Sequence, residues 1–98
     1  MLSVKVWVPK ARLIDVGIEL NALTEYCGGV TVYDAVGKWI DRDGMVVEGV
    51  LVHEWFAGSA DIIKLVIWAL LRSGEEAVAY GVGEHRYVTR TDDIQGLD

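Results

Sequence analysis

Alternation of apolar and polar positions at the start of the chain predicts a half-buried strand. Over residues 2–8 every second residue is leucine or valine, whereas Ser3, Lys5 and Trp7 occupy the positions between them. Pro9 is expected to end this strand, because its ring removes a backbone hydrogen-bond donor.

From residue 10 the apolar spacing changes to the three- and four-residue steps of a helix, which we expect to run over residues 10–27. The charged residues Arg12, Asp15 and Glu19 lie together on the side opposite the apolar stripe. That stripe consists of Leu13, Val16, Leu20, Leu23 and Cys27, widened by Ile14 and Ala22. Gly28 and Gly29 are expected to close the helix, since glycine readily adopts the left-handed backbone conformation.

Two long runs rich in β-branched and aromatic residues predict a hairpin in the middle of the chain. They cover residues 29–40 and 45–56, and the segment Asp41–Gly44 between them is typical of a turn. Each arm is longer than the usual strand of about 5–6 residues. Gly37 either continues the first arm or marks a bulge, which would turn Trp39 to the other face.

A second helix is expected to follow Gly58, with Ser59 as its N-cap and Asp61 near the positive end of the helix dipole. Residues 62–71 are apolar nearly all round this helix, and Ser73 and Gly74 stop it. Residues 75–90 then contain a fourth extended run.

The resulting order, β-α-β-β-α-β, predicts an α+β fold of the ferredoxin-like kind. It would have a four-stranded antiparallel sheet with both helices on one face. Residues 1–90 are expected to form this single domain, and residues 91–98 an acidic tail. A small barrel is the alternative if one of the helix predictions is wrong.

The second hairpin arm is apolar on both faces, which indicates that something covers both. Met45, Val47, Leu51 and Trp55 fall on one face, and Val46, Val50, Val52 and Phe56 on the other. Strands with two apolar faces are normally covered on both sides. We therefore expect a homo-oligomer, either a dimer or a trimer. The expected interface residues are Leu51, His53, Trp55 and Trp68.

The charge balance argues against nucleic acid as a partner. The chain has nine Lys and Arg and fifteen Asp and Glu, a net charge of −6, whereas phosphate binding requires clustered basic residues.

No apolar run approaches the roughly 20 residues of a membrane-spanning helix. The N-terminus does not have the pattern of a signal peptide, and a single cysteine, Cys27, fits a reducing compartment. We expect a cytoplasmic protein without a membrane or nucleic-acid partner.

Residues suited to metal binding or catalysis do not occur at supporting spacings. His53 and His85 have glutamates nearby, but His53 and Glu54 would point to opposite faces of a strand, and no H-x-x-x-H or C-x-x-C motif is present. Cys27 stands at a helix C-terminus, where a thiolate is not favoured. We predict no catalytic residue, no metal and no cofactor.

Aromatic and basic residues of the predicted sheet indicate a ligand site. Arg86 and Arg90 share one face of the last run, while His85 lies on the other. A cleft that combines these residues with aromatic rings would bind a small anionic ligand, such as a nucleotide, by stacking and charge pairing at a subunit junction. The candidate ligand-binding residues are Trp7, Tyr33, Trp39, His85, Arg86 and Arg90.

The segment Gly28–Trp39, followed by Asp43-Gly44 and a valine-rich return strand, resembles the central hairpin of small uncharacterised bacterial ferredoxin-like proteins. The arrangement is similar to that of copper-tolerance (CutA-like) and nitrogen-regulatory PII-like trimers, whose hairpins reach across subunits. The resemblance implies assembly through the hairpin. The chain lacks the motifs of the PII nucleotide loop and of a CutA metal site, so it implies neither function.

These observations favour a non-enzymatic homo-oligomeric binding protein, which recognises a small anionic ligand at a subunit junction or a protein partner through its sheet face. Two alternatives stay open. Short acidic chains are common among phage-encoded inhibitors of host defence proteins. Ferredoxin-like oxygenases and isomerases use pockets between sheet and helices, which would require His53 or His85 inside such a pocket.

Overall fold

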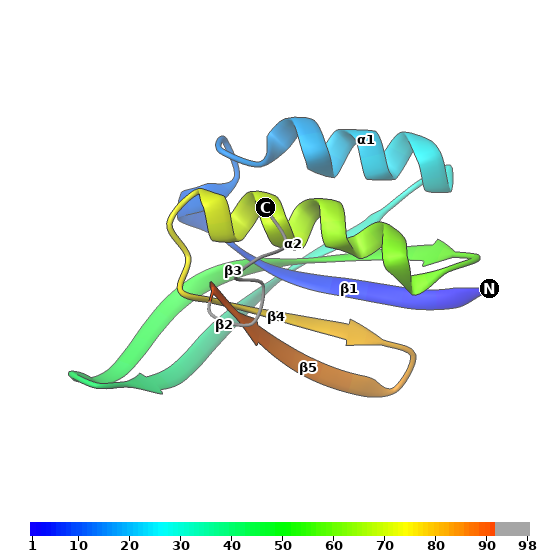
Figure 1. Cartoon of the computed structure of the whole chain (residues 1–98). Helices are drawn as coiled ribbons and strands as arrows, with labels where there is room; N and C mark the ends of the chain where they lie inside the picture. The colour runs from blue at the N-terminus through cyan, green and yellow to red at the C-terminus, as the bar shows by residue number, and fades with distance from the viewer. Residues whose placement is uncertain (92–98) are drawn as a thin grey trace.

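A computed structural model describes residues 1–91 of the chain, so the predicted acidic tail lies outside the described residues except for Thr91. The fold is α+β, and the chain runs through a strand, a helix, two strands, a second helix and two final strands (Figure 1). A short 3-10 helix precedes each α-helix. The elements are β1 (Leu2–Pro9), η1 (Lys10–Arg12), α1 (Gly17–Cys27), β2 (Thr31–Asp41), β3 (Gly44–Ala57), η2 (Ala60–Ile63), α2 (Lys64–Arg72), β4 (Ala77–Val82) and β5 (His85–Arg90).

The sheet has five antiparallel strands in the order β2-β3-β1-β4-β5, so the prediction of a four-stranded βαββαβ sheet is wrong. The difference arises in residues 75–90, which form two strands instead of one. The chain turns at Gly83, whose φ of +60° suits glycine, and β5 then folds back along β4. A second hairpin therefore forms one edge of the sheet.

The two helix predictions differ from the structure mainly at their starts. Residues 10–16 form η1 and turns, so α1 begins only at Gly17. Gly28 ends α1 as expected, with φ +86° and its N–H donating to the carbonyl oxygen of Thr24 at 2.9 Å. The hydroxyl oxygen of Ser59 accepts a hydrogen bond from the backbone N–H of Asp61 at 3.2 Å, which confirms the predicted cap. The capped turn is η2, ahead of α2.

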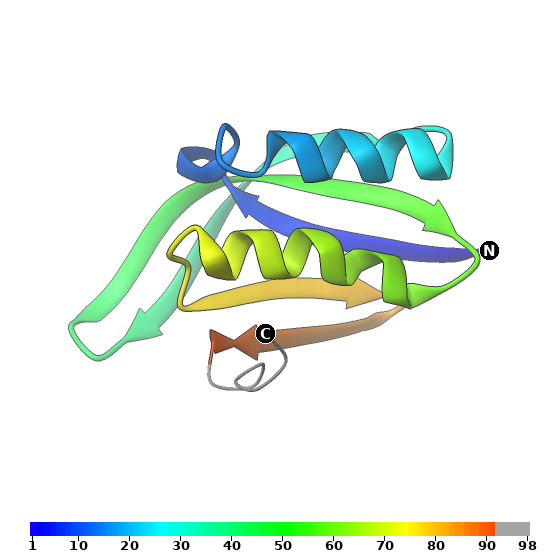
Figure 2. The same cartoon turned by 45° about the horizontal axis from the view of Figure 1, so that its top comes forward.

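The hydrophobic core lies between the sheet and the two helices, which cover the same face of the sheet (Figures 1 and 2). The predicted alternation of β1 is confirmed, because Val4, Val6 and Val8 are buried against the helices. Their main partners are Leu20 and Leu23 of α1, Trp55 of β3, Val66, Ile67, Leu70 and Leu71 of α2, and Val78 of β4. Within residues 1–91, no helix covers the other face of the sheet. We call it the open face.

The central hairpin has a regular ladder from Thr31↔Glu54 to Asp41↔Gly44. Gly37 is therefore not a bulge, and Trp39 points to the same face as Tyr33. The outer half of this hairpin extends past the ends of both helices, as Figure 2 shows. On its helix side this outer half leaves Val36, Ile40, Met45 and Val47 exposed.

Candidate ligand-binding groove

The open face combines residues from all five strands. The strand register places Trp7 of β1 opposite Val52 of β3, and Tyr33 of β2 opposite the same Val52 from the other side. Val50 and Val52 are fully buried although they point away from the helices. Trp7 and Tyr33 lie opposite Val52 on the neighbouring strands, and Pro9 and Ala35 lie opposite Val50. The single chain therefore buries apolar side chains on this face as well.

A groove of about 660 Å3 crosses the open face, from the outer half of the central hairpin to the β4–β5 hairpin. In Figure 1 the tip of β2–β3 and strand β5 both lie on the side of β1 opposite the helices. The sheet-face lining residues are Trp7, Pro9, Trp39, Val46, Glu48, Ala77, Ala79, Val88 and Arg90, and Arg42, Glu75 and Glu76 lie at the rim.

Trp39 is held in the groove by its own strand. A Cβ atom placed on Gly37 would lie only 2.5 Å from two atoms of the Trp39 indole, so the ring lies across the glycine. Gly37 is buried as a result, while Trp39 stays partly open to solvent. The two residues are i and i+2 on one face of β2, and the glycine is what lets the ring lie flat over the strand.

Trp7 is held by groups from β4 and β5. The central guanidinium carbon of Arg86 lies 5.4 Å from the centroid of the indole, a distance typical of a cation–π contact. The outer edge of the ring packs beside Gly81, the residue opposite Lys5 on β4. One edge of Trp7 is thus packed against the neighbouring strand, and the ring forms part of the groove.

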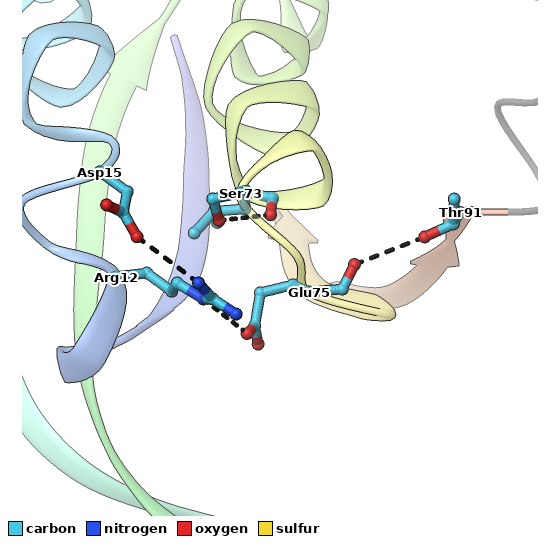
Figure 3. Close-up of polar contacts among 6 residues, drawn as sticks. Arg12, Asp15, Ser73, Glu75 and Thr91 are labelled. Carbon is cyan, nitrogen blue, oxygen red and sulfur yellow. Dashed lines mark hydrogen bonds and ion pairs between the residues drawn. The ribbon is translucent and has the colours of Figure 1, made fainter.

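Of the three glutamates that line the groove, Glu48 and Glu75 lie in different electrostatic settings. Glu75 pairs with Arg12, whose Nε lies 3.0 Å from a carboxylate oxygen, and Arg12 also reaches Asp15 at 3.5 Å. Figure 3 shows Arg12 between these two acids, beside the turn that follows α2. Burial raises the pKa of Glu48, and the negative charge of Glu75 raises it further, against an opposing effect of Arg12. Glu48 therefore keeps its proton to higher pH than an exposed glutamate does.

The turn after α2 keeps the Arg12–Glu75 pair in place. The hydroxyl of Ser73 donates to the carbonyl oxygen of Leu70 at 2.7 Å, and Gly74 adopts a φ of +119° directly next to the Arg12 guanidinium. On the other side, the hydroxyl of Thr91 donates to the backbone oxygen of Glu75 at 3.4 Å (Figure 3). Segments from the beginning and the end of the described chain thus meet at the groove rim.

The structure brings together three of the six candidate ligand residues, because Trp7, Trp39 and Arg90 all line the groove. Tyr33 and Arg86 point to the same open face but lie outside the groove lining. His85 lies on the opposite face of β5, where its ring is 6.4 Å from that of Tyr87. Sequence reasoning did not select Glu48, although a glutamate among valines of one face was a usable signal.

The structure places the four residues expected at a subunit interface on the helix-side face of β3 and on α2. Trp55 is fully buried in the core of the single chain, where its Nε1–H donates to the hydroxyl oxygen of Thr24 at 3.1 Å. The His53 ring stacks on Trp55 at 5.7 Å and is only 7% exposed. Trp68 packs against the same core, and Leu51 shares the helix-side face of β3. Because α1 and α2 cover this face, His53 and Trp55 offer no surface to a second copy.

His53 has the environment of a structural residue. Its Nδ1 lies 3.1 Å from the carbonyl oxygen of Leu51, which can only accept, so Nδ1 carries the proton. Burial lowers the pKa of His53, which favours the neutral ring. Burial also raises the pKa of the Cys27 thiol, so a reactive thiolate is not favoured there.

Residues 1–91 contain no cluster of three or more His, Cys, Asp or Glu side chains placed to hold a metal ion. Within the same part of the chain, neither helix is long and apolar enough to cross a membrane.

No protein-family model and no curated protein sequence matches the chain. The function is therefore inferred from the geometry of the groove and of the exposed strands.

Proposed function

We propose that the chain is a non-enzymatic binding protein that holds a small planar ligand with an anionic group in the groove of the open face. The observation that carries this proposal is the presence of two indole rings, Trp7 and Trp39, in the lining of one groove. Ligand sites usually have volumes of about 300–1,000 Å3 and combine aromatic or apolar walls with a few polar groups. The groove, at about 660 Å3, has this size and composition.

Stacking is the main recognition principle in this proposal. An aromatic ring stacked on one side chain contributes about 1–3 kcal/mol in single-stranded nucleic acid complexes, and every planar heterocycle offers a similar surface. Both indoles are already held by the fold, Trp39 over Gly37 and Trp7 beside Gly81. Ordering these side chains before binding lowers the entropy cost of holding a ligand.

Arginines supply the attraction for the anionic group. Arg42 and Arg90 belong to the groove lining, and a guanidinium recognises a carboxylate or phosphate through paired N–H donors. The carboxylates nearby weaken the attraction of these arginines for an anionic group only in part. Arg12 offsets the charge of Glu75, whereas Glu48 and Glu76 add negative charge to the groove lining. A ligand with both ring and anion matches this set of groups.

The enzyme alternative receives no support from the histidines. His53 lies in the layer between sheet and helices, but its ring packs on Trp55 and it does not line the groove. His85 lies on the edge strand β5, outside the groove lining. The inhibitor alternative depended on the short length and acidic composition of the chain, with its net charge of −6, and not on any residue of the groove.

Titration with adenosine monophosphate, followed by tryptophan fluorescence, tests the proposal. We expect saturable quenching, weaker binding of adenosine, which lacks the anion, and no quenching by inorganic phosphate alone. Trp7→Leu and Trp39→Leu should each weaken binding about tenfold, the loss of one stacking partner, and Arg90→Gln should reduce the preference for the phosphorylated ligand.

Tyr26→Leu is the matched control, because Tyr26 is an exposed aromatic residue on α1, away from the groove lining. Its binding curve should coincide with that of the unmodified protein. The proposal is contradicted if millimolar adenosine monophosphate produces no quenching, or if Tyr26→Leu weakens binding as much as the two groove variants do.

A further inference from the structure

The two edges of the sheet differ in how they are protected. Proteins normally shield edge strands by keeping them short or by placing charges, proline or bulges on them. β5 is six residues long and carries two arginines, His85 and no isoleucine or tryptophan. β2 has eleven residues, no proline and a ladder without a bulge. Its exposed apolar side chains are Val32, Tyr33, Val36, Trp39 and Ile40.

The sequence of β2 is complementary to a second copy of the same sequence that runs in the opposite direction. Counting outward from Val36, the positions two steps away are Asp34 and Lys38, which carry opposite charges. The positions three steps away are Tyr33 and Trp39, and those four steps away are Val32 and Ile40. Opposite residues of an antiparallel pair point to the same face. A second β2, antiparallel and centred on the same valine, would therefore pair charge with charge and ring with ring.

Only one register gives this match. Moving the centre by two residues would place Asp34 opposite Asp34 of the second copy, or Lys38 opposite Lys38 of the second copy. Moving it by one residue would place each charge opposite an aliphatic side chain. The charge pair and the aromatic pair thus indicate the same centre independently, and like charges directly opposite one another are unfavourable.

Asp34 already has one partner in the single chain, the ammonium group of Lys10. Both side chains of that pair are strongly exposed, with Asp34 at 73%, and exposed ion pairs contribute little to stability. A carboxylate has two oxygens that accept hydrogen bonds, so Asp34 can pair with a second cation as well.

We propose that β2 pairs antiparallel with β2 of a second copy around a two-fold axis at Val36, which joins the two sheets into one of ten strands. The pairing covers the exposed apolar side chains of this edge and gives partners to its outward N–H and C=O groups. It does not depend on a ligand. It would also bring Tyr33 of the second copy next to Trp39, so that each groove gains an aromatic neighbour from the other chain.

Sedimentation equilibrium at 1–100 μM, without ligand, tests the assembly. We expect the 10.8 kDa chain to sediment as a dimer. Asp34→Lys and Lys38→Asp should each weaken the dimer about tenfold or more, because they place like charges opposite one another. The double exchange, Asp34→Lys with Lys38→Asp, restores opposite charges and should return the affinity to near that of the unmodified protein.

A matched pair of valine substitutions separates the two edges. Val36→Lys would place two ammonium groups at the axis and should give a monomer, whereas Val88→Lys on β5 should leave the dimer intact. Val36 and Val88 are similarly exposed, at 67% and 60%, so both variants should keep the fold, as circular dichroism can verify. A monomer at 100 μM, a trimer, or a double exchange that restores nothing would overturn the proposal.

Cross-linking tests the register directly. In a Cys27→Ser background, Val36→Cys should form a disulfide between two copies under mild oxidation, because opposite residues of an antiparallel pair have Cα atoms about 4.5–5.5 Å apart. Ile40→Cys is the control, since position 40 would face Val32 of the second copy and not itself. Equal cross-linking at both positions would contradict a single register.

Discussion

The two faces of the sheet bury apolar side chains by different means. On the helix side, residues far apart in sequence cover the strands, and Trp55 and Val4 are inaccessible beneath α1 and α2. On the open face no helix is present, yet Val50 and Val52 are just as buried, because side chains of the neighbouring strands flank them. Burial on this face therefore involves strand neighbours such as Trp7 and Tyr33, which are themselves partly exposed.

This difference changes the explanation for the two apolar faces of the second hairpin arm, residues 45–56. We expected the open face to need a second copy as cover, but the single chain already shelters its central valines. The apolar surface that stays exposed lies farther out, on β2 and at the end of the hairpin that extends past the helices. Any partner of this chain is thus expected at the hairpin edge and not over Trp55.

The largest expected contrast between the faces is in stability. Trp55→Ala should lower the free energy of unfolding by about 3–5 kcal/mol, because it leaves a cavity in the core and removes the hydrogen bond to Thr24. Trp39→Ala on the open face should cost about 1 kcal/mol, since its ring is already 39% exposed. Urea unfolding measures both, and similar losses for the two variants would contradict the contrast.

A smaller effect is expected where the open face is tightly packed. Gly37→Ala should lower the free energy of unfolding by about 1 kcal/mol, because the new methyl group displaces the Trp39 ring. Gly29→Ala is the control, since a Cβ atom there would meet nothing within 4 Å. Equal stability of the two variants in urea would mean that Trp39 does not lie across Gly37.

The smallest expected effect concerns the pH dependence of the open face. The folded chain holds the Glu48 proton to higher pH than the unfolded chain, because burial raises the pKa of this carboxyl above its ordinary 4.5. Between these two pKa values the folded state binds more protons, so the stabilising contribution is present at low pH and is lost as the pH rises. Glu48→Gln should remove this dependence and make the protein slightly more stable at pH 7.

Urea unfolding at pH 4 and pH 7 measures the Glu48 effect. Glu84→Gln, in the exposed turn between β4 and β5, is the control that changes the net charge equally. A Glu48→Gln protein that is less stable than the unmodified one at pH 7 would show that the ionised carboxylate is favourable in the folded chain.

Much of the local structure could be predicted from the sequence, because it depends on short-range patterns. The alternation in β1, the turn at Asp41–Gly44, the left-handed Gly28 and the cap at Ser59 all follow from residues within a few positions of one another. The same short-range patterns did not predict that residues 75–90 form two strands. Ala77–Val82 and His85–Arg90 have the same extended character, and only the turn at Gly83 makes them two strands.

The candidate site, like the fold, could be predicted from the sequence only in part. The sequence grouped Trp7, Tyr33, Trp39, His85, Arg86 and Arg90 as one ligand site, and only Trp7, Trp39 and Arg90 of these line the groove. Parity along each strand is a local property, but the sequence left the face of Trp39 open at Gly37. It did not indicate the depth of the groove, the approach of Glu75 and Arg12, or the burial of His53 and Trp55. These depend on strand order and on how far the helices extend over the sheet.

By itself, the sequence determined the alternation of faces along β1 and the hairpin turn at Asp41–Gly44, because both follow from residues close together in the chain. Only the tertiary structure decided which face the helices cover and where the sheet becomes hollow. Those outcomes arise from contacts between segments distant in sequence, whose packing no local pattern encodes.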